Sequence, residues 1–402
     1  MKSPKLLYVS SLCGPGMQKY LWETSIIKPR QAVQKFHRLL SEGFAMHVPE
    51  GVDVLSSIPI TSLSHARRWW RSSTEQAGGI RYRYLTFINL PYIKNIFIFL
   101  LSMMSTLRWI LTHKAHQQYV ICDGLILSVT AGCMVSAKLM KQKVAVIVTD
   151  LPGLLIDNNQ MTGGLNERLH KQLVSYILTH FDYYIILTRQ MNEVVNPRKK
   201  PFIVMEGLVD DKGNQLENTF EEKGRERIII YAGGIYEEYG IKTLIKAFMQ
   251  LKDETVRLHI YGKGDMENDM PKYLALDSRI NYFGLVPNDV VVKRLTEATL
   301  LINPRPTKEE FVKYSFPSKN MDYMASGTPL LTTALPGMPE DYYDYVYLLK
   351  DESIEGFRIC LETLLDKHSS ELYKFGVKAK KFVLSNKNNR LQTKRILDLI
   401  VK

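Results

Sequence analysis

Short apolar segments recur along both halves of the sequence, those of the first half without polar alternation, and they limit the possible folds more than any other feature. In the first half they span residues 5–12, 119–124, 143–150 and 183–188. In the second half they span residues 227–234, 257–264, 279–286, 299–304, 329–334 and 345–349. Such segments are typical of parallel strands buried on both faces, and helical patterns separate them. We therefore predict an α/β chain with a doubly wound parallel sheet in each half.

The order of these segments predicts two domains. A polar stretch at residues 208–227, rich in Asp, Glu, Asn, Gly and Lys, separates the two series and indicates an interdomain linker. We predict an N-terminal Rossmann-like domain at 1–200, completed by a C-terminal helix at 385–402, and a C-terminal domain at 201–384. The apolar pattern at 391–400 needs a surface to cover, and we expect the first domain to supply it. Ligands of such sheets bind beyond the carboxyl ends of the strands, so we expect the site in a cleft between the domains.

Several classes of function find little support in the sequence. The four cysteines are scattered without a C-x-x-C pair, so we expect neither a zinc site nor a disulfide framework, as in a reducing cytosol. No G-x-G-x-x-G segment occurs, which argues against a dinucleotide-dependent oxidoreductase, and no Asp-x-Asp pair occurs to hold a metal–diphosphate complex. We expect no metal and no cofactor. The apolar run after Lys2 and Lys5 breaks at residues 13–15, so we also expect no signal peptide.

The positive charge of the chain is concentrated in its first half. Residues 1–200 carry 24 basic and 11 acidic side chains, a balance of +13, whereas the remaining 29 basic and 30 acidic side chains give −1. This asymmetry predicts an anionic partner for the first half, either nucleic acid or anionic lipid. Residues 65–84 mix five arginines with two tryptophans and two tyrosines, which suits a bilayer interface, single-stranded nucleic acid, or simply a solvated basic loop beside an aromatic strand. We expect an anionic membrane surface and no nucleic acid.

The most apolar segment spans residues 90–111. Lys94 and Arg108 lie inside it, and the uncharged core at 95–107 is shorter than the ~20 residues that a membrane span requires. We therefore predict a buried or half-exposed helix of the domain, with a helix lying on a membrane surface as the alternative.

The segment at residues 313–333 predicts a short helix that binds an anion. Pro317 suits the first position of a helix, and Gly327 suits its end. The helix N-terminus offers free backbone N–H groups, to which Ser318 adds a hydroxyl and Lys319 a charge. Asp322 follows Ser318 by four residues, about one turn of ~5.4 Å, which suits a carboxylate that accepts from two ribose hydroxyls. An ordinary aspartate on a solvated helix face is the alternative.

Glycines after the strands support the same interpretation. Gly233 and Gly234 follow one strand of the second series, and Gly262 and Gly264 follow the next. Glycines at such turns allow the backbone to approach a ligand closely.

Three motifs together resemble glycosyltransferase family 4, whose members have the GT-B fold. The segment "FPSKNMDYMASGTPLLTT" is similar to that family's Pro-Ser-Lys…Glu-Tyr-Met-Ala-x-Gly-x-Pro sequence, with Asp322 in place of the glutamate. "IYGKGD" resembles its strand-Gly-x-Gly turn, and "LPGMPEDY" its Gly-x-Pro-Glu turn. The resemblance covers residues 227–365, and segments 146–154 and 183–191 look like variants from enzymes of bacterial surface-polysaccharide assembly.

The resemblance implies transfer of a sugar from a UDP- or GDP-linked donor, with retention and without metal. It places Asp322 on the ribose, Ser318 and Lys319 on the diphosphate, and Gly262 and Gly284 near the base or phosphate. The expected donor-site residues are Gly233, Gly234, Gly262, Lys263, Gly264, Gly284, Ser318, Lys319, Asp322 and Glu340.

The sequence departs from the family pattern at the expected catalytic positions. The family's acidic residue is Tyr314 here, its arginine is Gly234, and its lysine is Tyr239, so the usual cationic clamp on the leaving diphosphate is absent. Lys319 is the catalytic candidate that could replace this charge. Asp150, at a strand end, is either a second catalytic residue or a turn aspartate.

These observations predict a hexosyltransferase with a lipid-linked or polysaccharide acceptor. The expected acceptor-side residues are Gly14, Gly16 and Asp150. A GT-B protein that binds a nucleotide or partner without catalysis is the alternative, and a sugar-nucleotide epimerase is a third candidate. We expect a cytoplasmic protein at the inner face of the plasma membrane.

Overall fold

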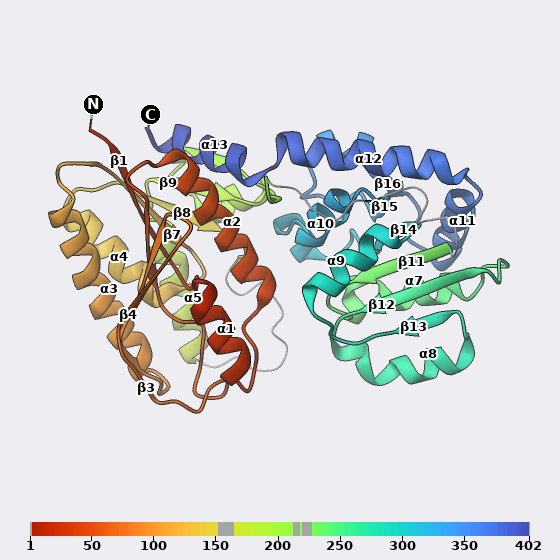
Figure 1. Cartoon of the computed structure of the whole chain (residues 1–402), viewed down its shortest axis with the longest axis horizontal. Coiled ribbons are helices and arrows are strands. Elements are labelled where there is room, and N and C mark those ends of the chain that lie inside the picture. The colour runs from red at the N-terminus through yellow and green to blue at the C-terminus, as the bar shows by residue number, and fades with distance from the viewer. Residues whose placement is uncertain (1, 152–164, 212–217, 219–226, 402) are drawn as a thin grey trace. The chain divides into compact units, whose positions relative to one another are not determined.

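The computed structural model describes residues 2–151, 165–211, 218 and 227–401, and of residues 165–171 the backbone alone. It consists of two compact units, Met1–Glu206 with Asn389–Lys402, and Gly207–Asn388 (Figure 1). We predicted these boundaries at 200/201 and 384/385. Each unit contains a mostly parallel sheet flanked by helices, so the predicted α/β fold class is confirmed.

The sheet of unit 1 has the strand order β10-β9-β8-β7-β1-β2-β5-β4. Its strands are β1 (Pro4–Ser10), β2 (Val52–Ser56), β4 (Ser73–Ala77), β5 (Ile80–Tyr84), β7 (Gln117–Asp123), β8 (Val144–Val148), β9 (Tyr183–Ile186) and β10 (Phe202–Val204). The neighbours pair in parallel except β4, which is antiparallel to β5. A separate antiparallel pair joins β3 (Trp69–Trp70) to β6 (Phe87–Ile88). Strand β5 alternates, with Tyr82 and Tyr84 buried and Arg81 and Arg83 exposed.

The helices of unit 1 are α1 (Pro15–Thr24), α2 (Gln31–His47), α3 (Ile93–Thr112), α4 (Leu127–Leu139), α5 (Leu165–Leu178), α6 (Met191–Val195) and α13 (Asn389–Val401). The last helix, α13, packs against α2, β9 and β10. Gly43 of α2 allows this contact, because a Cβ there would lie 2.5 Å from the Asn389 carbonyl oxygen. The C-terminal tail therefore lies on unit 1, where its apolar pattern had led us to expect it.

The sheet of unit 2 is parallel throughout, with the order β13-β12-β11-β14-β15-β16. Its strands are β11 (Arg227–Ala232), β12 (Val256–Tyr261), β13 (Ile280–Tyr282), β14 (Leu300–Asn303), β15 (Leu330–Thr333) and β16 (Tyr347–Leu349). Its helices are α7 (Ile241–Phe248), α8 (Met270–Leu276), α9 (Asn288–Glu297), α10 (Ser318–Ser326), α11 (Ile354–Leu365) and α12 (Ser369–Asn386). The strand order reverses between β11 and β14, so their carboxyl ends form the switch point at which doubly wound sheets bind ligands.

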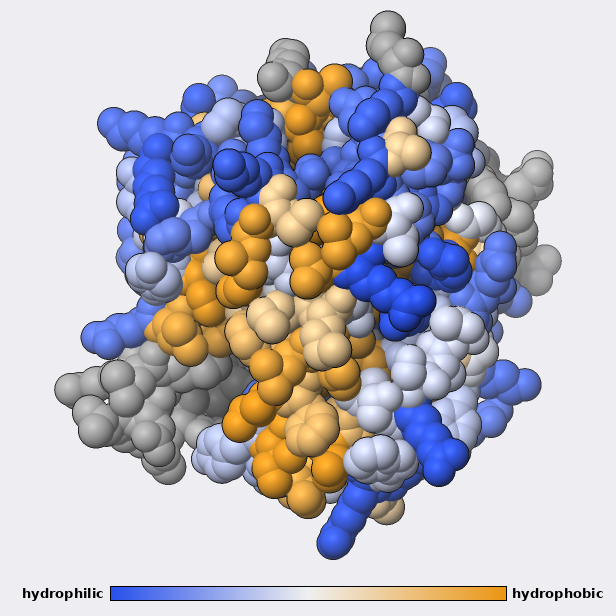
Figure 2. Space-filling view, turned by 90° about the vertical axis from the view of Figure 1, so that its left-hand side faces the viewer, coloured by the Kyte–Doolittle hydropathy of each residue, from blue (hydrophilic) through white to orange (hydrophobic). Residues whose placement is uncertain are grey.

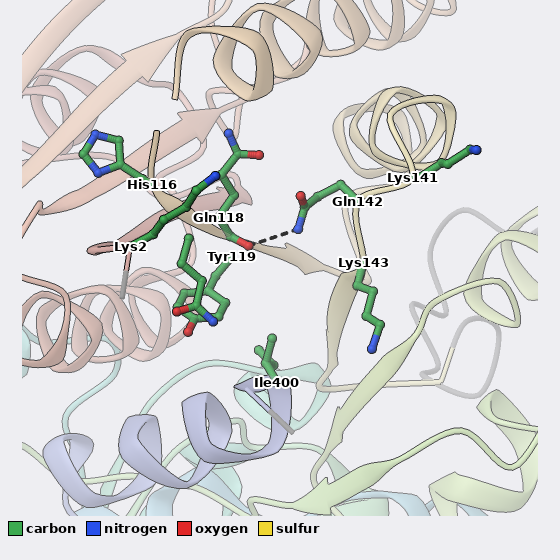
Figure 3. Close-up of a pocket in the computed structure, with 9 residues that line it drawn as sticks. Lys2, His116, Gln118, Tyr119, Lys141, Gln142, Lys143 and Ile400 are labelled. Atoms are coloured by element: carbon green, nitrogen blue, oxygen red, sulfur yellow. Dashed lines mark hydrogen bonds between the residues drawn. The ribbon is translucent and has the colours of Figure 1, made fainter. Parts of the chain in front are cut away.

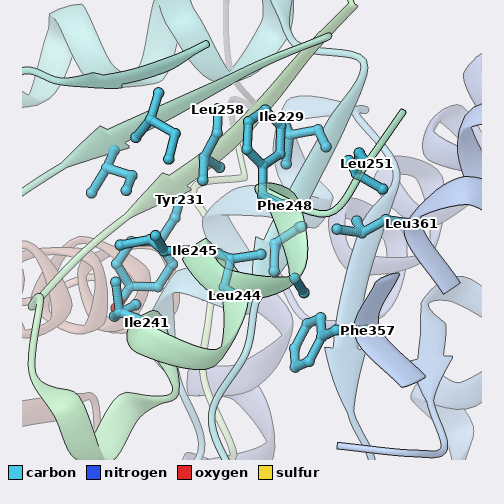
Figure 4. Close-up of a cluster of buried hydrophobic side chains, with 14 of the residues drawn as sticks. Ile229, Tyr231, Ile241, Leu244, Ile245, Phe248, Leu251, Leu258, Phe357 and Leu361 are labelled. Carbon is cyan, nitrogen blue, oxygen red and sulfur yellow. The ribbon is translucent and has the colours of Figure 1, made fainter. Parts of the chain in front are cut away.

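A buried apolar layer holds α7 and α11 against this sheet (Figure 4). Ile241, Leu244 and Phe248 of α7 recur at helical spacing, and all three are fully buried. They meet Ile229 of β11 from one side and Leu361 of α11 from the other. Because α7 follows the β11 loop, this packing fixes the loop at the switch point.

The polar stretch at 208–227 is not a simple linker. Residues 212–217 and 219–226 lie outside the described part, but Leu208 and Val209 are buried. The Val209 N–H donates to the Lys387 carbonyl at 3.0 Å. The start of the stretch is thus part of unit 2, because Leu208 and Val209 are buried there.

Candidate functional site

Helix α10 begins and ends as its sequence predicts, with one shift at its start. Pro317 is the N-cap rather than the first helical residue, and Ser318 opens the helix. Gly327 ends it with a φ of +79°, a conformation that favours glycine. Met321 and Met324 are buried, while Ser318 is exposed and Asp322, one turn later, is half-buried. The polar residues therefore remain on the accessible part of the helix.

Two tyrosines tie α10 to the end of β11. The Lys319 ammonium donates to the Tyr231 hydroxyl at 2.7 Å, and this hydroxyl donates to the Gly234 carbonyl at 2.5 Å. The Tyr323 hydroxyl accepts from the Ala232 N–H at 2.7 Å and lies 3.0 Å from the Ala232 carbonyl. These bonds hold the helix N-terminus beside the first glycine loop, which is the arrangement that a phosphate site requires.

A second cation, Arg305, lies in the same region, and the sequence analysis did not identify it. Arg305 follows β14 and is 7% exposed. Its guanidinium carbon lies 4.3 Å from the centre of the Tyr239 ring, and its Nη1 donates to Ser315 Oγ at 3.0 Å. The Lys319 ammonium lies 6.0 Å from the same ring. Arg305 thus brings a cation to the position at which the family lysine is replaced by Tyr239.

The electrostatics of this pair favour an anionic ligand. Burial lowers the pKa of Lys319 well below its ordinary value, and the charge of Arg305 lowers it further. Neither side chain has an acidic partner within ion-pair distance among the described residues, and the buried Arg305 Nε has no hydrogen-bond partner there. Arg305 also lowers the pKa of Glu238, although burial raises that pKa overall. Two enclosed cations without counter-charge are costly, and a bound anion would offset that cost.

The predicted glycine loops meet beside Lys319. A Cβ on Gly262 would lie 1.8 Å from the Gly233 carbonyl oxygen, and one on Gly264 would lie 2.4 Å from that of Ile235. A Cβ on Gly233 would lie 2.3 Å from Lys319 Nζ. The Gly262 N–H donates to Gly284, which has a φ of +64°. These glycines are therefore required first for the loops to pack on each other and to leave room for the Lys319 ammonium.

Other predicted donor-site residues are less closely joined to this cluster. The Lys263 side chain is 61% exposed and lies 3.9 Å from Glu267. Glu340 is exposed at the start of the 3-10 turn Glu340–Tyr345, and no described contact joins it to the glycine loops. Tyr314, which stands in the family's acidic position, ends the 3-10 turn Glu310–Tyr314.

In unit 1, an internal carboxylate occupies the predicted acceptor-side loop. Glu75 of β4 accepts from the backbone N–H groups of Gly16 at 2.7 Å and Met17 at 3.2 Å, and from the Tyr84 hydroxyl at 2.8 Å. The Gly14 N–H donates to the same tyrosine at 2.9 Å. The N-terminus of α1 therefore already binds a carboxylate of the same chain. This carboxylate, Glu75, lies on β4, a strand that the sequence did not predict.

Asp150, the predicted acceptor-side and catalytic aspartate, follows the end of β8. It is half-buried and interacts with another residue. Residues 152–164 beyond it lie outside the described part.

One hollow of unit 1 lies at the amino ends of its parallel strands, opposite the carboxyl ends that Asp150 follows. It has a volume of ≈ 640 Å³ and includes Lys2, His116, Lys141 and Lys143 (Figure 3). Gln142 bridges it by donating to the Gln118 carbonyl at 3.0 Å. These residues stand at the amino ends of β7 and β8, away from the edge at which such sheets bind ligands, so we do not assign the donor to it. Among the described residues no group of His, Cys, Asp and Glu could hold a metal ion.

Comparison with known proteins gives a family match within unit 2. Residues 226–367 match the family model "Glycosyl transferases group 1". No curated protein sequence matches the chain.

Solved structures of similar fold cover nearly all of the chain. Sucrose-phosphate synthase from Thermosynechococcus elongatus has a TM-score of 0.66 at 14% identity, over 99% of both chains. The lipopolysaccharide outer core galactosyltransferase WaaB gives 0.61 at 15%, and Anabaena HepE in complex with UDP gives 0.61 at 10%, each also over 99% of both chains. At these identities the likeness shows the fold alone. Residues 226–367 are therefore similar to the glycosyl transferases group 1 family, and the chain as a whole shares the two-domain GT-B fold of these structures.

Proposed function

We propose that the protein is a glycosyltransferase that moves a sugar from a nucleoside diphosphate sugar to an acceptor hydroxyl. The observation that carries the proposal is the pair of enclosed cations, Lys319 and Arg305, at the carboxyl edge of the unit 2 sheet. The group 1 match covers the same residues, and the structure of HepE contains UDP.

The chemistry needs a site that stabilises the departing diphosphate. As the glycosidic C–O bond breaks, negative charge grows on the diphosphate oxygen, and cations fixed in advance lower the energy of that state. Lys319 is held by Tyr231, and Arg305 by Tyr239 and Ser315. Neither has to reorganise to meet the charge. Lys319 and Arg305 thus supply the two positive charges that are missing because Gly234 and Tyr239 stand in the positions of the family's arginine and lysine.

The remaining donor contacts follow from α10 and the glycine loops. The helix N-terminus and the Ser318 hydroxyl bind phosphate oxygens, and Asp322 accepts from the ribose hydroxyls. The donor is UDP- or GDP-linked. Transfer proceeds with retention and without a metal, and the acceptor proton goes to Asp150 or to the leaving phosphate. The acceptor is a lipid-linked glycan or polysaccharide in the assembly of a bacterial surface, and the enzyme works at the inner face of the plasma membrane.

A calorimetric panel of UDP, GDP and ADP, followed by assays of donor hydrolysis and product analysis, tests this function. One diphosphate should bind selectively, and its sugar donor should be consumed. Binding without consumption of any donor would favour the alternative of a GT-B protein without catalysis, which the replaced residue at Tyr314 supports. A free sugar nucleotide as the product would indicate an epimerase.

A further inference from the structure

Helix α3 of unit 1 buries three hydroxyl residues beside Ile98, Trp109 and Ile110 and exposes much of its apolar surface. Its buried residues include Ser102, Ser105 and Thr106, whereas its exposed residues include Ile96 and Met104, at 60% and 61% exposure. Soluble domains usually bury the apolar stripe of a helix and expose the polar one. The outward face of α3 is therefore adapted to an environment other than water.

The apolar stripe runs along most of the helix. Its exposed members are Tyr92, Ile93, Ile96, Phe97, Leu100, Met104 and Leu111. From Ile93 on they fall on one face of the helix, at spacings of one, three, four or seven residues over about 27 Å. Figure 2 shows a continuous apolar band on the side of the molecule where α3 and α4 lie, with hydrophilic side chains around it. A patch of this size on a soluble domain marks an interaction surface.

Basic side chains accompany the stripe almost without acidic ones. Residues 54–149 contain 11 Lys and Arg but two acidic residues, Glu75 and Asp123. Asp123 is buried, and Glu75 is bonded to the α1 N-terminus.

A basic groove of ≈ 520 Å³ lies between α3 and strands β4 and β5. Arg81, Arg83 and Arg108 line it together with Asp53, Ser72 and Thr74. Arg81 pairs with Asp53 at 2.8 Å. Arg83 and Arg108 have no acidic partner among the described residues, so both are available for an anion.

We propose that α3 docks unit 1 on an anionic lipid bilayer. The helix lies in the plane of the membrane, with the stripe from Tyr92 to Leu111 at the boundary between head groups and acyl chains. The groove beside it receives lipid phosphates on Arg83 and Arg108. This surface lies outside the donor site, and the inference does not depend on the proposed function.

The inner face of α3 argues for docking rather than spanning. The whole helix, which includes Lys94 and Arg108, is long and apolar enough to cross a membrane by length and composition, unlike its uncharged core at 95–107. However, Ser102 donates to the Val129 carbonyl at 2.6 Å, and Trp109 Nε1 donates to Asp53 at 2.7 Å. A spanning α3 would have to give up these bonds, so the domain keeps it at the surface.

Two other partners fit the surface less well. In a symmetric dimer through this surface, Arg83 and Arg108 of one copy would face the same arginines of the other. The repulsion between these like charges disfavours such an interface. Single-stranded nucleic acid needs several accessible rings for stacking, but of the tryptophans and tyrosines at 65–84 Trp69 alone is exposed, while Trp70, Tyr82 and Tyr84 are buried. An anionic bilayer matches both the apolar stripe and the charge.

Flotation of the full chain with vesicles tests the proposal. Vesicles of phosphatidylglycerol mixed with phosphatidylcholine should bind the protein, and pure phosphatidylcholine should bind it at least about tenfold more weakly. Leu100→Glu/Met104→Glu and Arg83→Glu/Arg108→Glu should each reduce binding about tenfold or more. Circular dichroism should show that both variants remain folded, because all four side chains are on the surface.

Unit 2 offers matched controls for both kinds of change. Leu276→Glu/Leu285→Glu alters residues that are 61% and 65% exposed, and Lys308→Glu/Lys350→Glu reverses exposed charges. Both should bind vesicles like the wild type. Equal binding of all four variants would overturn the proposal. So would a wild-type dimer that ignores vesicles and separates in Leu100→Glu/Met104→Glu, or tight RNA binding in place of lipid binding. Resistance of the bound protein to alkaline extraction would indicate a span instead.

Discussion

Replacing Lys319 by methionine should stabilise unit 2 and weaken nucleotide binding at the same time. Methionine keeps an unbranched chain of similar length but removes the enclosed ammonium, whose pKa burial and Arg305 hold well below the ordinary value. Removing buried charge without a counter-ion is often stabilising, and we expect a gain of about 1 kcal/mol in the free energy of unfolding. The loss of the hydrogen bond to Tyr231 reduces this gain only in part, because the tyrosine hydroxyl still donates to the Gly234 carbonyl.

The same substitution should weaken UDP or GDP binding by about 1.5–3 kcal/mol, roughly 10- to 150-fold, the range for a hydrogen bond to a charged group. Denaturant unfolding and calorimetric titration measure the two effects on one sample. Lys313→Met is the matched control, since this exposed lysine pairs with Glu310 at 2.9 Å, and it should change both quantities little. A folded Lys319→Met protein that binds the nucleotide as tightly as the wild type would refute the role of Lys319.

Four further outcomes follow from the same structure. Arg305→Gln should weaken nucleoside diphosphate binding by about 1.5–3 kcal/mol in calorimetry, whereas loss of unit 2 folding without a specific binding defect would assign Arg305 to structure alone. Asp322→Ala should cost a similar amount, and unchanged affinity in the folded variant would exclude its ribose contact. Because the folded protein lowers the pKa of Lys319, it binds fewer protons than the unfolded chain between that pKa and the ordinary lysine value. The unfolding free energy of the wild type should therefore rise with pH in this window relative to that of Lys319→Met. Over the same window nucleotide affinity of the wild type should fall as the ammonium deprotonates. Parallel pH profiles of the two proteins would contradict both expectations. Glu75→Gln should destabilise unit 1 by about 1–3 kcal/mol in thermal unfolding, since an amide cannot accept from all three donors now bound to the carboxylate; Glu23→Gln, on the exposed side of α1, is the control.

The strands and the phosphate-binding helix could be predicted because their signals are local. Strands β11 and β14 of unit 2 are largely apolar runs, and α10 is bounded by Pro317 and Gly327. Strands β2, β4 and β5 gave no such signal, since β5 alternates Arg with Tyr and β4 is polar. In the sheet β2 pairs with β1, β5 with β2 and β4 with β5, so their position depends on pairing across the chain rather than on local pattern.

The missed residues owe their roles to contacts that are distant in sequence. Arg305 follows β14 and reaches Tyr239, which ends the 3-10 turn Glu237–Tyr239 66 positions earlier, so no motif links the two. Glu75 meets Gly16 in the same way, from β4. By contrast, the spacing of Ser318, Lys319 and Asp322 is set by one helix and was visible in the sequence.

The central claim is that Lys319 and Arg305 together bind the diphosphate of a nucleotide-sugar donor. Calorimetric titration of UDP and of uridine, or of GDP and guanosine if guanine is preferred, into wild type and Arg305→Gln/Lys319→Met tests it most directly. The double variant should lose at least about 1.5 kcal/mol of affinity for the diphosphate and little for the nucleoside, because the cations contact phosphate and not the base. An equal loss for both ligands, or no loss for either in a folded protein, would contradict the account.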